Sequence, residues 1–332
     1  MAPKTPLITV LGSLNIDLVS YVSHHPLPGE TMTSNSFAVS PGGKGANQAV
    51  ACAKLSRSHT TSSSSSSSPT TDETAHIRML GAVGADSYGS LLTSNLSSHG
   101  VDVSGVTSSP ALKTGIAVIV VDEPTGQNRI ILSPEANHSL QPSGFAVLPA
   151  PRPDLLIMQL EIPVPTVLAA LRAARDASVP VLLNPAPAQP LPEDAYVGLA
   201  HLVVNETEAA VLGGVSEAEL ESEAGLERVS QKFVGLGVQN IIVTLGGRGV
   251  FYRSAAAAGA NKKGLVPAEK AKVVDTTAAG DTFVGQYALD VVGAGGGSEF
   301  DIEAAVRKAN RAAAKTVEKL GAQDSIPWRD EL

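Results

Sequence analysis

The stretch Asp275-Thr276-Thr277-Ala278-Ala279-Gly280-Asp281-Thr282-Phe283 contains a turn of small residues that opens a helix. The residues 272–275 before the turn favour a strand, and the apolar residues from Phe283 to Val291 recur at helical spacing. Ala279 and Gly280 leave little or no side chain at the start of this helix, so backbone N–H groups can face an anion. The stretch therefore predicts a seat for a phosphate group.

Asp281 falls in the first turn of the same helix, where the helix dipole favours an ionised carboxylate. A carboxylate beside a phosphate seat indicates a general base that takes a proton from a hydroxyl as a phosphoryl group arrives. The alternative is that Asp281 only caps the helix and Gly280 only makes the turn. The local pattern alone leaves both interpretations open.

Strand and helix patterns alternate over most of the chain. Buried-strand runs occupy residues 8–11, 77–83, 154–159, 181–183, 202–204 and 240–245, and helical patterns occupy 87–99, 164–171, 206–212 and 302–320. This alternation predicts an α/β fold, with a central, mainly parallel sheet covered by helices on both faces in Rossmann-type layering. Ligands of such folds bind at the carboxyl ends of the strands.

Polar residues gather where the predicted strands end, in the segments 159–161, 184–187, 205–208, 244–247 and 275–281. Caps and turns explain one such cluster, but five together indicate a site. After the first strand, Asn15 and Asp17 are two residues apart and point to the same side if the chain is extended. They could hold a diol, or they could be turn formers.

A glycine-rich loop at residues 41–50 leads into another predicted helix. Gly42 and Gly43 let the backbone approach a ligand, and Lys44 and Asn47 add polar groups. The loop lacks the spacing of a Walker A motif, and no Gly-x-Gly-x-x-Gly follows the first strand, which disfavours a dinucleotide fold.

Short β-like pieces at residues 19–40 and 114–133 break the alternation and predict a small separate sheet, a lid on one domain that spans residues 1–332. The apolar residues Ile116, Val118 and Val120 alternate on the lid with too little chain nearby to cover both faces. We therefore expect a homodimer that pairs through the lid. Residues 56–75 contain seven consecutive serines and predict a mobile surface insertion.

The composition limits the partners and the compartment. A formal charge of −8 over 332 residues argues against nucleic-acid partners, so a nucleotide would be held by helix N-termini, isolated basic residues and a divalent metal. Cys52 is the only cysteine, which excludes an internal disulfide. No apolar run suits a signal peptide or a membrane span, so we expect no membrane partner and a reducing compartment, cytoplasm or nucleus.

Residues 42–49 and 275–283 together resemble the two signature regions of the ribokinase-like (PfkB) carbohydrate kinase family. Further blocks resemble the family in the same order, at residues 12–17, 184–188, 205–209, 244–249 and 321–328. The likeness spans nearly the whole chain. It implies a ribokinase-like fold, a homodimer and ATP-dependent phosphorylation of D-ribose at its 5-hydroxyl, with Mg²⁺ carried by the nucleotide and K⁺ as activator.

The resemblance also implies roles for individual residues. Asp281 would be the catalytic base, and Ala279 and Gly280 would form the anion hole. The sugar would contact Asn15, Asp17, Gly43, Lys44, Gly45, Ala46, Asn47, Glu161 and Asp281, and the nucleotide would contact Asn205, Thr244, Leu245, Gly246, Gly247, Arg248, Gly249, Gly280, Asp281 and Asn310. Glu208 would help to place magnesium through water, and potassium would lie among Asp275, Thr277, Thr316, Lys319, Gly321 and Ser325.

One departure from the family pattern concerns Glu135, which stands where the family usually has glycine. Two other functions stay open at this point. One is a related kinase that acts on fructose, a nucleoside or another sugar. The other is a non-catalytic sugar or nucleotide sensor with the same fold.

Overall fold

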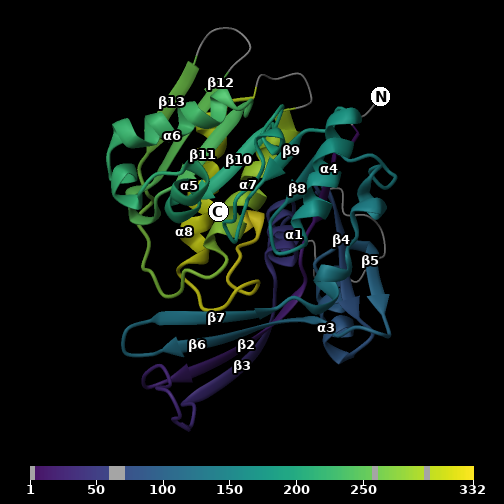
Figure 1. Cartoon of the computed structure of the whole chain (residues 1–332), viewed down its shortest axis with the longest axis vertical. Helices are drawn as coiled ribbons and strands as arrows, with labels where there is room; N and C mark the ends of the chain where they lie inside the picture. The colour runs from purple at the N-terminus through teal and green to yellow at the C-terminus, as the bar shows by residue number, and fades with distance from the viewer. Residues whose placement is uncertain (1–3, 60–71, 256–260, 295–299) are drawn as a thin grey trace.

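A nine-stranded sheet forms the centre of the main body in the computed structural model, which describes residues 4–59, 72–255, 261–294 and 300–332 (Figure 1). The strand order is β13-β12-β11-β10-β9-β8-β1-β4-β5. All neighbours are parallel except the antiparallel pairs that β12 forms with β11 and β13. The strands are β1 (Leu7–Leu11), β4 (His76–Gly84), β5 (Asp102–Ser109), β8 (Leu155–Met158), β9 (Val181–Leu183), β10 (His201–Asn205), β11 (Asn240–Thr244), β12 (Val250–Ala255) and β13 (Asn261–Val266).

Helices cover both faces of this sheet, as predicted. Alternate residues along a strand point to opposite faces: Leu155 and Ile157 of β8 belong to one hydrophobic core, and Leu156 and Met158 belong to the other. The first core is closed by α1 (Lys44–Leu55), α3 (Ser87–Ser98), α7 (Ala279–Gly293) and α8 (Ile302–Thr316), and the second by α4 (Val164–Asp176), α5 (Glu206–Gly213) and α6 (Glu223–Gly235).

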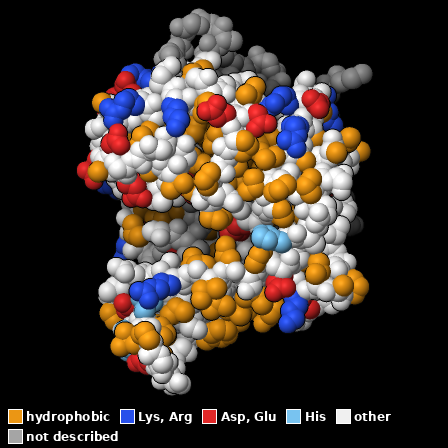
Figure 2. All heavy atoms as spheres, in the orientation of Figure 1, with side chains coloured by type: hydrophobic (Ala, Val, Ile, Leu, Met, Phe, Trp, Pro, Cys, Tyr) orange, Lys and Arg blue, Asp and Glu red, His pale blue; other side chains and the backbone are white. Residues whose placement is uncertain are grey.

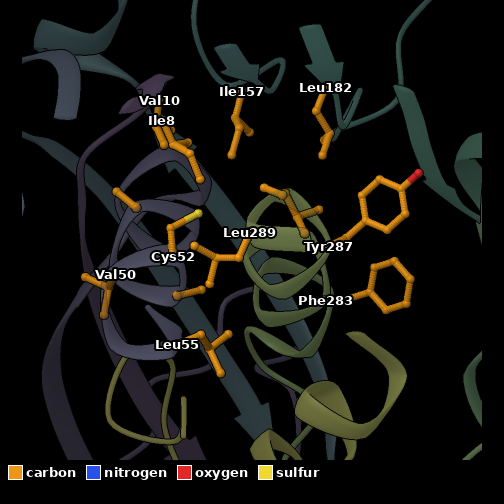
Figure 3. Packing of buried hydrophobic residues seen from close by; sticks show 14 of the residues in the cluster. Ile8, Val10, Val50, Cys52, Leu55, Ile157, Leu182, Phe283, Tyr287 and Leu289 are labelled. Atoms are coloured by element: carbon orange, nitrogen blue, oxygen red, sulfur yellow. The ribbon is translucent and has the colours of Figure 1, made fainter. Parts of the chain in front are cut away.

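Helices α1 and α7 lie side by side in the first core, with Cys52 and Leu289 among the residues packed there (Figure 3). Gly285 of α7 allows this close approach, because a Cβ atom at that position would lie 2.6 Å from the Cβ atom of Ala51. The contact falls one turn after Asn47 on α1 and one turn after Asp281 on α7. The two helices therefore bring their N-terminal turns to the same place.

A separate four-stranded sheet forms the lid, in the order β3-β2-β6-β7 (Figure 1). Its strands are β2 (Asn15–Val22), β3 (Ser36–Gly42), β6 (Gly115–Asp122) and β7 (Gln127–Ser133). The predicted hairpin of β6 and β7 is confirmed. The strands β2 and β6 are parallel, whereas the other two pairs are antiparallel.

Two predictions about secondary structure were wrong. Residues 272–275 form no strand, because the backbone N–H groups of Val274 and Asp275 donate to the carbonyl of Val317 instead of to a neighbouring strand. The helical pattern predicted over 302–320 ends early, since α8 stops at Thr316 and Leu320 is exposed.

The residues that flank the serine run are anchored to the C-terminal segment. Arg57 pairs with Glu73, and the Arg329 side chain donates to the carbonyls of Ser56 and Asp72. Residues 60–71, on which most of the predicted mobile insertion falls, lie outside the described residues. None of the helices in the described ranges has the length and apolar character that a membrane crossing needs.

Candidate active site

Two cavities meet at the carboxyl edge of the main sheet. The polar cavity, of about 200 Å³, is lined by Lys44, Asn184, Ala186, Val203, Val204, Asn205, Glu208, Thr244, Thr276, Ala278, Gly280 and Asp281. The apolar cavity, of about 500 Å³, is lined by residues that include Gly246, Gly247, Gly249, Val250, Ala268, Ala279, Phe283, Asn310, Ala313 and Val317. Thr244, Thr276 and Gly280 line both cavities. The space-filling view shows a hollow between the lid and the main body (Figure 2).

The N-terminus of α7 lies where the cavities meet. Ala278 caps the helix with a left-handed backbone, at φ 60°, so the chain turns sharply before Ala279. Among the described residues, no heavy atom outside the adjoining chain lies within 4 Å of the position that a Cβ atom would take on Gly280. The predicted phosphate seat is therefore open space at the start of a helix. The N–H of Ala279 donates to the carbonyl of Thr276 at 3.3 Å, whereas the N–H groups of Gly280 and Asp281 have no acceptor in the described contacts.

Asp281 is buried at this junction and accepts hydrogen bonds on both carboxylate oxygens. The side-chain nitrogen of Asn47 donates to its Oδ2 at 3.1 Å, and that of Gln48 donates to its Oδ1 at 2.9 Å. Both donors come from the first turns of α1. Asp281 therefore does more than cap its helix, because a second helix holds its carboxylate at the edge of the polar cavity.

Two further carboxylates, Asp17 and Glu161, lie close to Asp281. Burial, together with the charges of Glu161 and Asp281, raises the pKa of Asp17 to about 7. Glu161 is held in place because its Oε2 accepts from the hydroxyl of Ser13 at 2.5 Å and from the backbone N–H of Lys44 at 3.0 Å. Asn15 and Asp17 both lie on β2 and face the same side of the lid sheet, as predicted.

Lys44 is the cation among these acids. Burial alone would lower the pKa of its ammonium group, but the nearby carboxylates, chiefly Asp281 and Glu161, raise it overall. Four carboxylates act on this one lysine, since Glu208 and Asp17 contribute as well. The excess of negative charge leaves room for a further cation.

The other predicted sugar contacts have mixed positions. Gly43 has φ 88°, and a Cβ atom there would lie 2.7 Å from the backbone nitrogen of Asn15, so the loop packs directly on the start of β2. The N–H groups of Gly45 and Ala46 donate to the side chain and the carbonyl of Ser13, respectively. Of the nine predicted sugar contacts, only Lys44 and Asp281 are among the residues that line the two cavities.

Asn137 sets the direction of the Asn15 amide. Its Oδ1 accepts from the backbone N–H of Leu14 at 2.9 Å, which fixes its Nδ2 as the atom that donates to Asn15 Oδ1 at 2.8 Å. Asn15 therefore has its own NH₂ group left to donate. Glu135, at the start of this segment, has φ 48°, a left-handed conformation that costs a glycine nothing.

Most of the predicted nucleotide residues lie around the apolar cavity. Asn310 lines it while donating to the carbonyl of Pro267 at 2.8 Å. Two predicted residues do not line either cavity: Leu245 is buried in the second core, and the Arg248 side chain is paired with Glu206.

Glu208 and Asn205 close the polar cavity at the start of α5. They form a capping box in which Glu208 accepts from the backbone and side-chain nitrogens of Asn205, at 2.9 and 3.0 Å. Burial raises the pKa of Glu208. Within the described ranges, no group of three or more His, Cys, Asp or Glu side chains is placed to hold a metal ion by itself.

Three of the predicted potassium residues are brought together. Asp275 accepts from the backbone N–H and the hydroxyl of Thr277, and its second oxygen accepts from the N–H of Gly321 at 3.0 Å. Ser325 lies four residues beyond Gly321. The side chains of Thr316 and Lys319 have other partners: the hydroxyl of Thr316 donates to that of Thr282, and Lys319 pairs with Glu331.

Sequence reasoning missed four polar residues of this region: Gln48, Asn137, Gln159 and Gln323. Gln48 follows Asn47 directly in the glycine-rich loop, which was the one available signal for it. Gln159 and Gln323 fall in the singled-out segments 159–161 and 321–328, but their contacts are made with residues far away in the chain, so no local pattern gave their role.

Comparisons with known proteins identify the family of the chain. A family model described as "pfkB family carbohydrate kinase" matches residues 5–329. The chain belongs to this family. Among pfkB family members, the ribokinase of Schizosaccharomyces pombe is 40% identical over 329 residues, with 96% of this chain and 94% of that protein covered. The deoxyribokinase of Salmonella typhimurium is 33% identical, with 96% of this chain and 95% of that protein covered.

A comparison with a solved structure supports the fold. The ribokinase of Arabidopsis thaliana, complexed with ribose and ATP, matches with a TM-score of 0.81 and 29% identity, and the match covers 98% of this chain and 97% of that one. The expected fold, with its mainly parallel sheet and small second sheet, is therefore confirmed.

Proposed function

We propose that the chain transfers the γ-phosphoryl group of ATP to the 5-hydroxyl of D-ribose. The observation that carries the proposal is the junction at Gly280, where a polar cavity and an apolar cavity meet beside the carboxylate of Asp281. An acceptor hydroxyl on one side and a nucleotide on the other would face each other across this junction. Relatives named ribokinase, and a related structure with ribose and ATP, support the choice of substrates.

The sugar would be held by groups of fixed direction. Asn15 has its NH₂ group left as a donor, and Asp17 offers carboxylate oxygens to a pair of hydroxyls. Lys44 and Asn47 complete the polar contacts. Orientation of this kind contributes up to about 7–11 kcal/mol in favourable cases, which makes it the largest expected part of catalysis.

Asp281 would take the proton of the 5-hydroxyl as the hydroxyl oxygen attacks the γ-phosphorus. General base catalysis is worth about 10²–10⁴-fold. The amide groups at Ala279 and Gly280 would hold the oxygens of the migrating phosphoryl group, since the helix start offers donors and a positive dipole end. Gly280 offers its N–H directly, whereas that of Ala279 would first give up the carbonyl of Thr276, 3.3 Å away. The lid would exclude water from the junction.

Magnesium fits as a partner of the nucleotide. Mg²⁺ keeps several waters and binds through one or two carboxylates plus substrate phosphates, which suits a site with excess negative charge and no metal cage among the described residues. Glu208 would reach it through water, because both carboxylate oxygens already accept from Asn205. The ion would neutralise charge on the phosphates.

Potassium fits between two loops that Asp275 joins through its bonds to Thr277 and Gly321. A large, weakly hydrated cation suits the backbone carbonyls that such loops present. Ser325 would contribute from the second loop, and Thr316 and Lys319 could take part only through their carbonyls, because their side chains bond elsewhere.

A homodimer would cover the outer face of the lid. The register places Val39, Leu18, Val118 and Ile131 in one row across all four strands, on the face opposite to Asp17. Val39, Val118 and Ile131 are exposed by 45%, 37% and 65%, and hydrophobic side chains gather over the lid in Figure 2. A patch of this kind marks an association surface. Light scattering at micromolar concentration should give a dimer.

The test is ADP release with ribose, 2-deoxyribose, fructose and adenosine, each with and without potassium. We expect ribose to be the preferred acceptor and potassium to raise its turnover. The likeness to a deoxyribokinase makes 2-deoxyribose the main competing acceptor. Ribose binding by calorimetry without ADP release would support a non-catalytic sensor instead. A reducing compartment, cytoplasm or nucleus, stays a prediction.

A further inference from the structure

A chain of buried amide side chains continues outward from Asp281 on both sides. On one side, Gln323 Nε2 donates to Asn47 Oδ1 at 3.0 Å, and Asn47 Nδ2 donates to the carboxylate. On the other side, Gln159 Nε2 donates to Gln48 Oε1 at 2.6 Å, and Gln48 Nε2 donates to the carboxylate. All four amide residues are buried.

The direction of each amide follows from its partner. An ionised carboxylate only accepts hydrogen bonds, so Asn47 and Gln48 must each turn the NH₂ group toward Asp281. Their carbonyl oxygens then point outward and need donors. Gln323 and Gln159 supply these donors, and neither backbone N–H groups nor hydroxyls do so in the described contacts. If either inner amide turned around, its oxygen would face a carboxylate oxygen.

The outer residues are themselves fixed. Gln323 Oε1 accepts from Asn95 Nδ2 at 2.6 Å, and its backbone carbonyl accepts from the ammonium group of Lys54 at 3.2 Å. Lys54 in turn lies over the ring of Trp328, 5.5 Å from its centre. The C-terminal segment thus anchors the first arm of the chain.

The second arm of the chain lowers the stability of the fold at Gln159. The Oε1 atom of Gln159 is buried and has no hydrogen-bond partner among the described residues. Buried polar atoms are nearly always paired, and an unpaired one is destabilising. The loss is understandable if the Gln159 side chain is required to aim its NH₂ group at Gln48.

We propose that Gln323 and Gln159 are positioning residues for phosphoryl transfer, which hold Asn47 and Gln48 as donors to Asp281 from opposite sides. The inference rests on the proposed function of Asp281 as the general base. The two arms keep the carboxylate aimed at the junction of the cavities. They act through other residues and touch neither substrate.

The test replaces each outer glutamine by an acid of the same shape. In Gln159→Glu and Gln323→Glu, the group that faced the inner amide can no longer donate while it is ionised. We expect kcat to fall by about 10–100-fold, the range seen for residues that orient an active group through another residue. The acidic limb of the pH profile of kcat should move to higher pH, since the ionised base loses support.

The variants of the two arms should differ in their KM for ribose. Asn47 is a proposed sugar contact, so Gln323→Glu should raise the KM for ribose as well as lower kcat. Gln48 is not a proposed sugar contact, so Gln159→Glu should lower kcat and leave the KM for ribose within about two-fold of the wild-type value. Gln231→Glu is the matched control, because Gln231 is exposed and only accepts from Arg253, which a carboxylate does equally well.

Wild type is measured in parallel. If wild type releases no ADP with any acceptor, the proposed function fails. If wild type is active and both Glu variants keep its kcat and pH profile, the positioning proposal is overturned. A lower kcat with an unmoved pH profile also overturns it, because that result is structural damage. Should circular dichroism show that a Glu variant is unfolded, Gln159→Met and Gln323→Met replace it, with the same expected direction of both changes and the same overturning result.

Discussion

The two cavities that meet at Gly280 are built in opposite ways. Charged and amide side chains define the polar cavity, and several are held by hydrogen bonds, as Asn47 and Gln48 hold Asp281 and as Asn205 holds Glu208. Glycines and apolar side chains line most of the apolar cavity. Under the proposed function, the difference teaches that proton transfer demands fixed charges, whereas a nucleotide base demands mainly a surface of the right shape. Substitutions should therefore be far more damaging on the polar side.

The strongest test of this contrast is Asp281→Asn. The amide keeps the shape of the side chain but cannot take a proton, so kcat should fall by about 10²–10⁴-fold. Ribose affinity, measured by calorimetry, should stay within a few-fold of wild type. A variant that kept more than a tenth of the wild-type kcat would refute the assignment of the base.

A pair of glycine substitutions compares the two sides directly. Gly43→Ala forces a left-handed backbone on alanine and places its Cβ atom 2.7 Å from the nitrogen of Asn15, so unfolding should become easier by about 1–3 kcal/mol. The KM for ribose should rise at least tenfold. Gly247→Ala meets no heavy atom within 4 Å among the described residues, so kcat and the KM for ATP should change less than two-fold. Steady-state kinetics and thermal melts of both variants measure the contrast, and equal effects would remove it.

The pH dependence of ribose binding should be a property of the polar side alone. Burial and neighbouring carboxylates raise the pKa of Asp17 to about 7. Below that pH the side chain is protonated and loses acceptor capacity, so ribose affinity should fall by up to about tenfold per pH unit as the pH drops from 7 to 5. For Asp17→Asn, calorimetry should show a lower ribose affinity that changes less with pH. ADP affinity should not follow the Asp17 titration, and a parallel loss of both affinities would contradict the contrast.

The smallest expected effect concerns Glu135→Gly. A non-glycine residue in the left-handed region costs about 1–2 kcal/mol, and the greater freedom of glycine in the unfolded chain offsets about half of this. Chemical denaturation should show a gain of no more than about 1 kcal/mol. Activity should be unchanged, because Asn137 rather than Glu135 contacts the site. A loss of stability would show that Glu135 makes a compensating contact.

Local patterns predicted the main sheet, the lid hairpin and the position of the site because each depends on a short stretch. Buried strands such as β9 and β11 are apolar runs, and Asp281 follows a turn of small residues. The edge strands β5 and β13, and β12 beside β13, were not predicted. β5 is half exposed and carries no continuous apolar run, so little in its sequence separates it from a loop.

The amide partners of Asp281 could not be predicted, for a physical reason. Gln323 bonds to Asn47 across 276 residues, and Gln159 bonds to Gln48 across 111. Glutamine is common on protein surfaces, and only the tertiary fold decides which glutamine is buried beside which amide. The strand that was wrongly predicted at residues 272–275 has the same explanation. The backbone N–H groups of Val274 and Asp275 donate to the carbonyl of Val317 at the end of α8 and not to a neighbouring strand.

The close contact between α1 and α7 at Gly285 has a consequence for redesign of the site. Because α1 and α7 approach there with only the methyl group of Ala51 facing Gly285, the acid and its two amide donors are held by two tightly packed helices. Adjustment to acceptors of other sizes must come from β2 and β6 of the lid, where Asp17 and Ala117 lie opposite each other on neighbouring strands. An engineer who wants a new acceptor should vary the inner face of those two strands and leave the helix pair untouched.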